Sequence, residues 1–484
     1  MAAEDKFIVA LEIGSSKVTG VAGRKEPDGA IRVLAYAQEP SAAFIRKGSI
    51  FNPDKMAQCI KSIKKKLEDK LQKTISQVYV GIEGMGMHTV ANSISKNFNE
   101  KRIVDNETVD EILDANRRAT TPGREILDVI PQEYRLGTQS QLDPIGFYTD
   151  HIEGRFLNVV ASTSICDCVR TSFEKAGVHT VETLITPLRL AGIVLTEAEK
   201  SSGCVFVDMG FGTTSVAIYK GGILRHLAVI PLGGENITHD ITSLQIDDDE
   251  AEELKLAHGA AVYDEKDNEH PDLQLHDGRN VKFDEFSSIV EARVEEIVRN
   301  IDNQIKLSGY ERNQLYGGIV LTGGASLLRS TERAISRFTG FEKMRFVKAI
   351  RLPMRATPSD FNKNGAYNAA IALIDGATEN CCGGDPATQG TMFPTDEELK
   401  QKAEEEKRRK EEEELKKREA DAEAARLAAQ KALEEEAQRR EEAIREQRRE
   451  KRRQIWQRIK NTLTGIVSED DETAMLSGKN DKKN

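Results

Sequence analysis

The feature that most constrains the fold is a short pattern that occurs twice, about 195 residues apart. In residues 204–219 an apolar run that suits a buried strand ends at Asp208, and glycines and hydroxyl residues then precede a second strand. Residues 7–22 repeat this order, with Glu12 as the acid. One copy alone is more typical of an ordinary hairpin turn. Two copies predict two related α/β lobes, each offering a turn to one polyphosphate between them.

These turns define the candidate phosphate site, because exposed amides and hydroxyls in a tight turn can cradle a phosphate. Glu12 and Asp208 are the candidate acids for holding the water shell of a cation, and we expect no direct protein ligand to a metal. A glycine pair that follows a predicted strand at 227–231 opens a predicted helix at 235–244, whose N-terminus can face a phosphate, although such a turn needs no ligand. The candidate phosphate-binding residues are Gly14, Ser15, Ser16, Lys17, Gly210, Gly212, Thr213, Thr214, Gly233 and Gly234.

Composition narrows the class of protein. The chain has 484 residues, which suggests two to four domains, and its net charge of −11 argues against a general nucleic-acid binder. Six cysteines show neither metal-finger nor secretory spacing, which favours free thiols in a reducing cytosol. The first residues lack the pattern of a signal peptide, and no apolar run approaches the length of a membrane-spanning helix. We therefore expect a protein that is cytosolic or attached to a membrane from the cytosolic side.

A third element completes a known pattern. Residues 319–325 form an apolar run followed by two glycines, and the two hairpins and this run, in that order, resemble the ATP-binding signature of the actin, Hsp70 and sugar-kinase superfamily. Within it, the chain resembles the FtsA family of bacterial cell-division proteins over about residues 6–375. This resemblance implies an α/β, actin-like two-lobed ATPase fold that binds ATP with Mg²⁺. The stretches that carry it are 129–134, 143–146, 186–197, 232–241 and 250–255.

The resemblance also implies an adenosine site. Glu252 and Lys255 are three residues apart on a predicted helix, so both side chains can reach one ligand edge, and in relatives such a pair grips ribose and adenine. The alternative is a surface ion pair worth less than about 1 kcal/mol. Gly323 and Gly324 allow the backbone to approach a flat purine, and Ala325 opens the helix that is predicted to follow. Weak ATPase activity stays an open question, because Glu12 is one methylene longer than the Asp that the pattern usually carries.

Residues 84–165 differ from a phosphate-binding lobe and read as an inserted small α+β subdomain with a helix at 107–119. By resemblance, this insertion mediates contacts between neighbouring subunits. Two further helices are expected to pack between the lobes, at 184–199 and 365–374.

The end of the chain changes in character. Residues 378–394 read as a linker, and 395–450 as a charged, solvated helical spacer that would span on the order of 80 Å. Residues 451–468 then form a basic amphipathic helix with the chain's single tryptophan, which is typical of a membrane-targeting helix; docking on its own domain or on a partner is the alternative. A polar, acidic tail, expected to be disordered, fills 469–484. The candidate membrane-binding residues are Arg452, Arg453, Ile455, Trp456, Arg458, Ile459, Lys460, Leu463, Ile466 and Val467.

Together, these features predict a first lobe that begins with residues 1–83, the insertion at 84–165, the remainder of the two lobes at 166–377, and the tail segments above. The resemblance implies a protein that polymerises and tethers FtsZ to the cytoplasmic face of the inner membrane at the division site. It implies other division proteins and an anionic membrane surface as partners, and no nucleic acid. The alternatives are a pilus-assembly adaptor of the same fold, and a small-molecule kinase, for which we find no Asp base.

Overall fold

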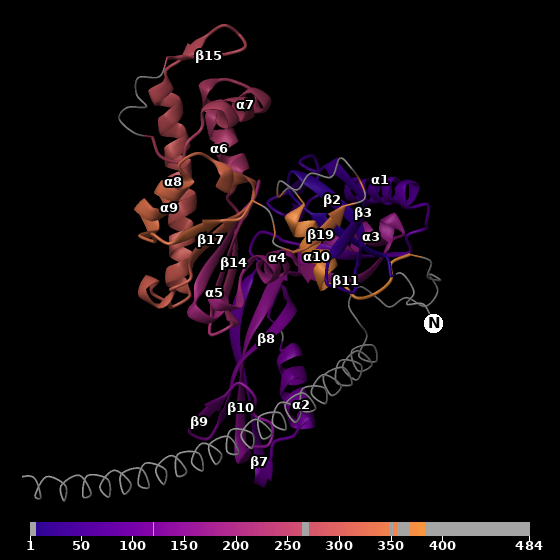
Figure 1. Cartoon of the computed structure of the whole chain (residues 1–484). Helices are drawn as coiled ribbons and strands as arrows, with labels where there is room; N and C mark the ends of the chain where they lie inside the picture. Colours follow the sequence, from indigo (N-terminus) through magenta and orange to yellow (C-terminus); the bar gives the residue numbers. More distant parts are fainter. Residues whose placement is uncertain are drawn as a thin grey trace, which may run out of the picture. The chain divides into compact units, whose positions relative to one another are not determined.

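The computed structural model describes residues 6–119, 121–263, 271–348, 350, 352–356, 358, 365 and 367–382 (Figure 1). All of these belong to one unit of the chain. The expected spacer, amphipathic helix and polar tail, and most of the expected linker, lie outside the described residues.

The first lobe is built on a six-stranded sheet with the order β11-β6-β1-β2-β3-β19. β1 and β2 form an antiparallel hairpin, whereas β6 and β11 run parallel to β1. The carboxyl ends of β1, β6 and β11 therefore meet at one edge of the sheet, where ligands bind in open α/β folds. The strands are β1 (Ile8–Ile13), β2 (Lys17–Lys25), β3 (Ile31–Pro40), β6 (Gln77–Ile82), β11 (His179–Ile185) and β19 (Met354–Ala356), with a small hairpin of β4 (Ile45–Arg46) and β5 (Ser49–Ile50).

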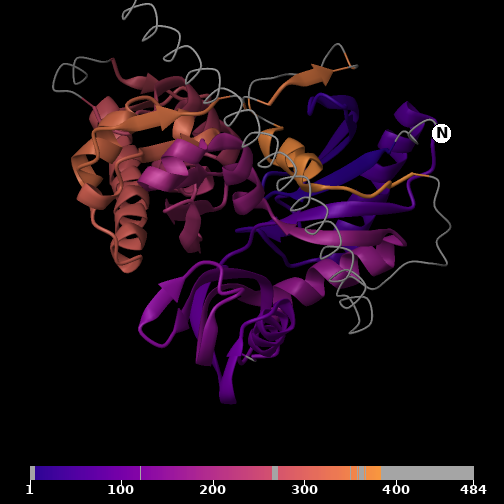
Figure 2. The ribbon, with the colours of Figure 1, turned by 60° about the horizontal axis from the view of Figure 1, so that its bottom comes forward.

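Helices α1 (Pro53–Leu71), α3 (Thr163–Ala176) and α10 (Asn368–Gly376) cover this sheet. The Asn52 side chain starts α1 by accepting a hydrogen bond from the Lys55 amide at 3.0 Å. α10 lies directly against the first strands (Figure 2), so closely that a Cβ added to Gly81 would meet Leu373 Cδ1 at 2.4 Å. This contact explains why β6 carries a glycine next to the site.

The second lobe repeats the hairpin of the first. Its strands belong to a nine-stranded sheet with the order β18-β17-β12-β13-β14-β7-β10-β8-β9, in which β12 and β13 are antiparallel and β17 is parallel to β12. The strands of this lobe are β12 (Cys204–Met209), β13 (Thr214–Lys220), β14 (Ile223–Ile230), β17 (Gly318–Thr322) and β18 (Met344–Phe346), with a small hairpin of β15 (Leu273–Gln274) and β16 (Asn280–Val281). Its helices are α6 (Gly234–Ile241), α7 (Asp248–His258), α8 (Phe283–Leu307) and α9 (Thr331–Thr339), with 3₁₀ turns at Thr242–Leu244, Arg312–Gln314 and Gly324–Leu327.

The expected insertion extends this second sheet. Its strand β7 pairs with β14 at a single position, His88 opposite Ala228, and the remaining strands follow outward (Figure 1). Helix α2 (Asn106–Arg117) packs on these strands, and a separate core that includes Ile112 and Phe156 holds the insertion together. The strands of the insertion are β7 (His88–Ile103), β8 (Arg124–Leu136), β9 (Gln139–Gln141) and β10 (Tyr148–Ser162).

Three predicted helices differ from the observed ones. The helix expected at 184–199 is two helices, α4 (Thr186–Val194) and α5 (Glu197–Ser202), because Thr196 caps a new helix through reciprocal hydrogen bonds with Glu199. The helix expected at 235–244 ends at Ile241 and continues as a 3₁₀ turn. Ala325 belongs to a 3₁₀ turn, and the following α-helix begins only at Thr331.

In the described part of the chain, no helix is both long and apolar enough to cross a membrane. All six cysteines are free thiols, and five of them are buried.

Candidate functional site

The two predicted phosphate turns lie against each other. A Cβ added to Gly212, in the second-lobe turn, would lie 2.7 Å from Ser15 Oγ in the first-lobe turn, so only glycine fits at this contact. The Gly48 amide donates to Ser15 Oγ at 2.8 Å, and the Gly210 amide donates to the Thr213 carbonyl at 2.8 Å. The fold thus brings together two turns that are far apart in sequence.

Backbone donors in these turns are available to a ligand. Among the described residues, no hydrogen bond uses the amides of Ser15, Ser16 or Gly212. Ser15 and Gly212 are buried, whereas Ser16 is exposed. Because buried amides are almost always paired, the unpaired amides of Ser15 and Gly212 at the contact between the two turns fit an anion such as a polyphosphate.

Glu83 is a residue of the site that the sequence analysis missed. It directly follows β6, at the same sheet edge as Glu12. Its Oε1 accepts hydrogen bonds from Thr213 Oγ1 at 3.1 Å and from Ser215 Oγ at 2.6 Å, both in the second lobe. The signal in the sequence was an acid at the end of an apolar run, directly before the predicted insertion.

Three carboxyl groups, those of Glu12, Glu83 and Asp208, share this region. Burial raises the pKa of Glu12 to about 7, although Lys17 lowers it, and Glu83 raises it further. Burial also raises the pKa of Glu83, against the effect of its two hydroxyl donors. The pKa of Asp208 is raised well above its usual range by burial and then by Glu83 and Glu12. These groups repel one another when ionised, so a cation nearby would stabilise them.

No group of three His, Cys, Asp or Glu side chains in the described ranges is arranged to hold a metal ion directly. Carboxylates at the strand ends instead suit a hydrated Mg²⁺, which keeps several of its waters.

The glycine pair at the start of α6 packs on the second-lobe turn. The Gly234 amide donates to the Gly210 carbonyl at 3.0 Å, and the Gly233 amide donates to Asn236 Oδ1 at 2.9 Å. The Thr214 hydroxyl is buried and donates to the Leu232 carbonyl at 2.8 Å, so its proton is already used in a hydrogen bond within the protein.

The predicted adenosine residues also come together. Lys255 Nζ, on α7, contacts the Gly234 carbonyl at 3.1 Å, Thr238 Oγ1 at 2.8 Å and Glu252 Oε2 at 2.6 Å. Lys255 is only 7% exposed, whereas the Glu252 side chain is 36% exposed, so the lysine end of the pair is buried and the carboxylate end faces solvent. A Cβ added to Gly234 would lie 3.4 Å from the Ala325 Cβ, which places Ala325 beside the same surface.

Gly323 joins this surface to Asp208. Its φ angle is +90°, and an added Cβ would lie 2.3 Å from the Met209 carbonyl oxygen and 2.4 Å from Asp208 Oδ1. Only glycine combines this backbone conformation with so close an approach. Gly324 follows in a 3₁₀ turn with open space around it.

Lys17 lies at the first-lobe turn, with its Nζ 5.8 Å from the centre of the Tyr367 ring. Its positive charge lowers the pKa of Glu12, so Lys17 is close enough to act on that carboxyl group.

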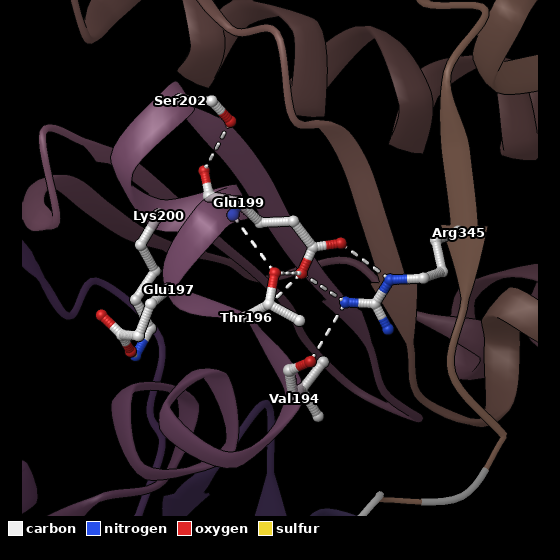
Figure 3. A network of polar contacts seen from close by, with 7 residues as sticks. All are labelled: Val194, Thr196, Glu197, Glu199, Lys200, Ser202 and Arg345. Atoms are coloured by element: carbon white, nitrogen blue, oxygen red, sulfur yellow. Dashed lines mark hydrogen bonds and ion pairs between the residues drawn. The ribbon is translucent and has the colours of Figure 1, made fainter. Parts of the chain in front are cut away.

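A polar network fixes the helices that lead into the second lobe (Figure 3). Arg345, on β18, donates from Nε and Nη2 to the two carboxylate oxygens of Glu199 at 2.8 and 2.7 Å, and from Nη2 to the Val194 carbonyl at 3.0 Å. Glu199 also accepts from the Thr196 amide at 2.8 Å. The break between α4 and α5 is therefore tied to an edge strand of the second lobe.

Comparisons with known proteins agree with this architecture. A family model described as "Cell division protein FtsA" matches residues 205–372, and one described as "SHS2 domain inserted in FTSA" matches residues 84–160. A cell division protein FtsA from Porphyromonas gingivalis is 30% identical over 337 residues, which cover 68% of this chain and 70% of the relative. The FtsA of Escherichia coli K12 is 25% identical over 399 residues, 79% of this chain and 93% of the relative.

Among solved structures, the PilM–PilN type IV pilus biogenesis complex aligns with a TM-score of 0.53 at 17% identity, covering 76% of this chain and 97% of that one. At this identity the likeness concerns the fold alone.

Two lobes with paired hairpin turns, and an SHS2 subdomain inserted between strands, define an actin-like protein of mixed α/β class. The chain belongs to the FtsA family of cell division proteins, because relatives with that name are 30% identical over two thirds or more of their length.

Proposed function

We propose that the chain binds ATP with Mg²⁺ between its two lobes. The contact of Ser15 with Gly212 carries this proposal, since it brings two turns with unpaired amides to one place. Glu12 and Asp208 would hold the water shell of Mg²⁺, which when bound screens the charge of the phosphates. The Gly234, Lys255 and Gly323 surface would receive the adenosine.

Substitution at the contact between the turns tests nucleotide binding. We expect ATP to raise the melting temperature of the wild-type chain, and Gly212→Ala to abolish this rise, because the new Cβ would separate the turns. Gly192→Ala, in α4 with nothing within 4 Å of the added Cβ, is the matched control and should keep the full response. If ATP leaves the wild-type melting temperature unchanged, the proposal is wrong.

Phosphate release from the wild type and from Glu12→Asp then decides whether bound ATP is hydrolysed.

We further propose that the chain attaches to the cytoplasmic face of the inner membrane and tethers FtsZ there, polymerising with other copies at the division site. Membership of a cell-division family and the basic, tryptophan-containing sequence 451–468 support this role.

Membrane attachment is tested by one substitution in this segment. Trp456→Glu should remove most binding to anionic liposomes in co-sedimentation, since a charge replaces the largest apolar side chain of the predicted anchor. Trp456→Phe should retain most of it. If Trp456→Glu and the wild type co-sediment equally, Trp456 does not contribute to membrane binding and the proposed anchor is wrong. Retention of added FtsZ on these liposomes by the wild type, and its loss with Trp456→Glu, tests the tether.

A further inference from the structure

The carboxylate of Glu83, in the first lobe, accepts hydrogen bonds from two hydroxyl groups of the second lobe. The two hydrogen bonds, from Thr213 Oγ1 and Ser215 Oγ, join the two lobes directly. Thr213 directly follows Gly212, whose amide is unpaired, and Ser215 lies in β13 opposite Asp208, so a phosphate bound at this turn would lie beside the Thr213 hydroxyl.

A carboxylate and a phosphate compete for such donors. Each is an acceptor of charge-assisted hydrogen bonds, and two anions in a shielded site repel each other strongly. An arriving polyphosphate therefore favours an arrangement in which the Glu83 carboxylate has left the turn.

The backbone that follows Glu83 leads directly to the inserted subdomain. The Met85 amide donates to the Lys47 carbonyl at 3.0 Å, and the Val229 amide of β14 donates to the Met87 carbonyl at 2.9 Å. The Leu227 amide donates to Thr89 Oγ1 at 3.0 Å, beside the single pairing of β7 with β14. Few residues thus separate Glu83 from the base of the insertion.

The start of this segment is closely held. Gly48 has a φ of +70°, and a Cβ there would lie 2.0 Å from the Glu83 carbonyl oxygen. This contact fixes the backbone at Glu83 on the side of Gly48, so backbone movement that accompanies release of the Glu83 carboxylate would have to be taken up by residues 84–89.

We propose that Glu83 is a latch between the lobes: its carboxylate holds the second lobe through Thr213 and Ser215, and nucleotide binding displaces it and shifts the base of the inserted subdomain. The inference rests on the proposed nucleotide site and adds its regulation. Glu83 is a positioning residue here, acting through the hydroxyls that it occupies.

Nucleotide affinity gives the first test. A chain that must release a latch binds with an affinity reduced by the fraction of released molecules. Glu83→Ala should therefore bind ATP about tenfold more tightly than the wild type, and Glu83→Gln, which keeps the volume and one acceptor, should fall between them. Glu174→Ala, which removes an exposed acid on α3, should match the wild type. Unchanged or weaker binding by Glu83→Ala would overturn the latch and indicate that Glu83 supports the bound nucleotide.

Hydrogen exchange without nucleotide tests the latch independently of ATP binding. In Glu83→Ala, the amides of Met85, Leu227 and Val229 should exchange at least about threefold faster than in the wild type. In the wild type, ATP should accelerate the same amides, and in Glu83→Ala it should add little. Unchanged exchange in the nucleotide-free variant refutes the latch even if ATP binds. Failure of the wild type to bind ATP refutes the nucleotide site instead, and the melting temperatures of both Glu83 variants show that they are folded.

Discussion

At the scale of single residues, the site is a cluster of carboxyl groups that repel one another when ionised. Glu12, Glu83 and Asp208 all have raised pKa values because the fold removes them from water and places them near each other. Such an arrangement costs stability in the absence of a ligand, as is common where a protein prepares a binding site.

The cost predicts how stability depends on pH. The Glu12 carboxyl has a pKa of about 7 in the folded chain and an ordinary value of 4.5. Between these values the folded chain holds a proton that the unfolded chain has lost, so the free energy of unfolding falls as pH rises through this window. Glu12→Gln should therefore be more stable than the wild type by up to about 3 kcal/mol at pH 8, and close to it at pH 4.5.

Urea denaturation of the nucleotide-free chain at the two pH values measures this difference. Glu174→Gln, at an exposed position, provides the control. An equal effect of Glu12→Gln at both pH values would show that the Glu12 carboxyl is not held in its neutral form.

At the scale of elements, the break between α4 and α5 is the point at which these two helices are bonded to the second lobe. Arg345 contacts both the end of α4, through the Val194 carbonyl, and the start of α5, through Glu199 (Figure 3). The pair is partly buried, with side-chain exposures of 26% and 17%. Burial raises the pKa of Glu199, but Arg345 and the Thr196 amide outweigh it, so the pKa lies below its ordinary value.

This junction should be measurable in the free energy of unfolding. Arg345→Met leaves the half-buried Glu199 without its partner and should cost about 1–3 kcal/mol. A double-mutant cycle with Glu199→Ala should give a coupling of about 1–2 kcal/mol. The exposed pair of Arg355 with Asp28, also at 2.8 Å, is the matched control, and Arg355→Met should cost less than about 0.5 kcal/mol. Similar losses at both pairs would contradict a special role for the junction.

At the scale of the whole molecule, the inserted subdomain exposes apolar side chains at its tip. Ile103 and Tyr148 lie opposite each other on β7 and β10 and are 61% and 69% exposed, and Leu142 and Ile145 are exposed in the neighbouring segment. An apolar patch of this kind is typical of an interaction surface. It supports the proposed self-association.

Self-association should therefore respond to a change at this tip. Ile103→Lys should raise the protein concentration needed for ATP-dependent assembly on lipid by at least about tenfold, because a charge would be buried at the contact. Sedimentation of liposome-bound protein measures this. Gln58→Lys, which adds the same charge on the exposed side of α1, should have little effect. If Ile103→Lys assembles at the same protein concentration as the wild type, the tip of the inserted subdomain is not part of the interface between copies of the chain.

Much of the fold was predictable because local patterns decide it. The two hairpins, the strand at 319–322 and the small subdomain after residue 83 follow from apolar runs, turn residues and their order. Helix limits were less predictable at 184–199, where Thr196 and Glu199 form a cap and Ile185 pairs in β11. A cap and a continuing helix use similar residues, and packing chooses between them.

The sequence by itself determined the two acid–glycine–hydroxyl turns, because strand patterns and glycine positions are local properties of the chain. Only the tertiary structure decided which side chains meet across the lobes: Ser15 against Gly212, Gly323 against Asp208, and Glu83 on Thr213 and Ser215. Glu83 lies 130 residues from Thr213, and no local pattern couples two such positions. Their contact depends on the packing of one sheet edge against another, which is a property of the folded chain.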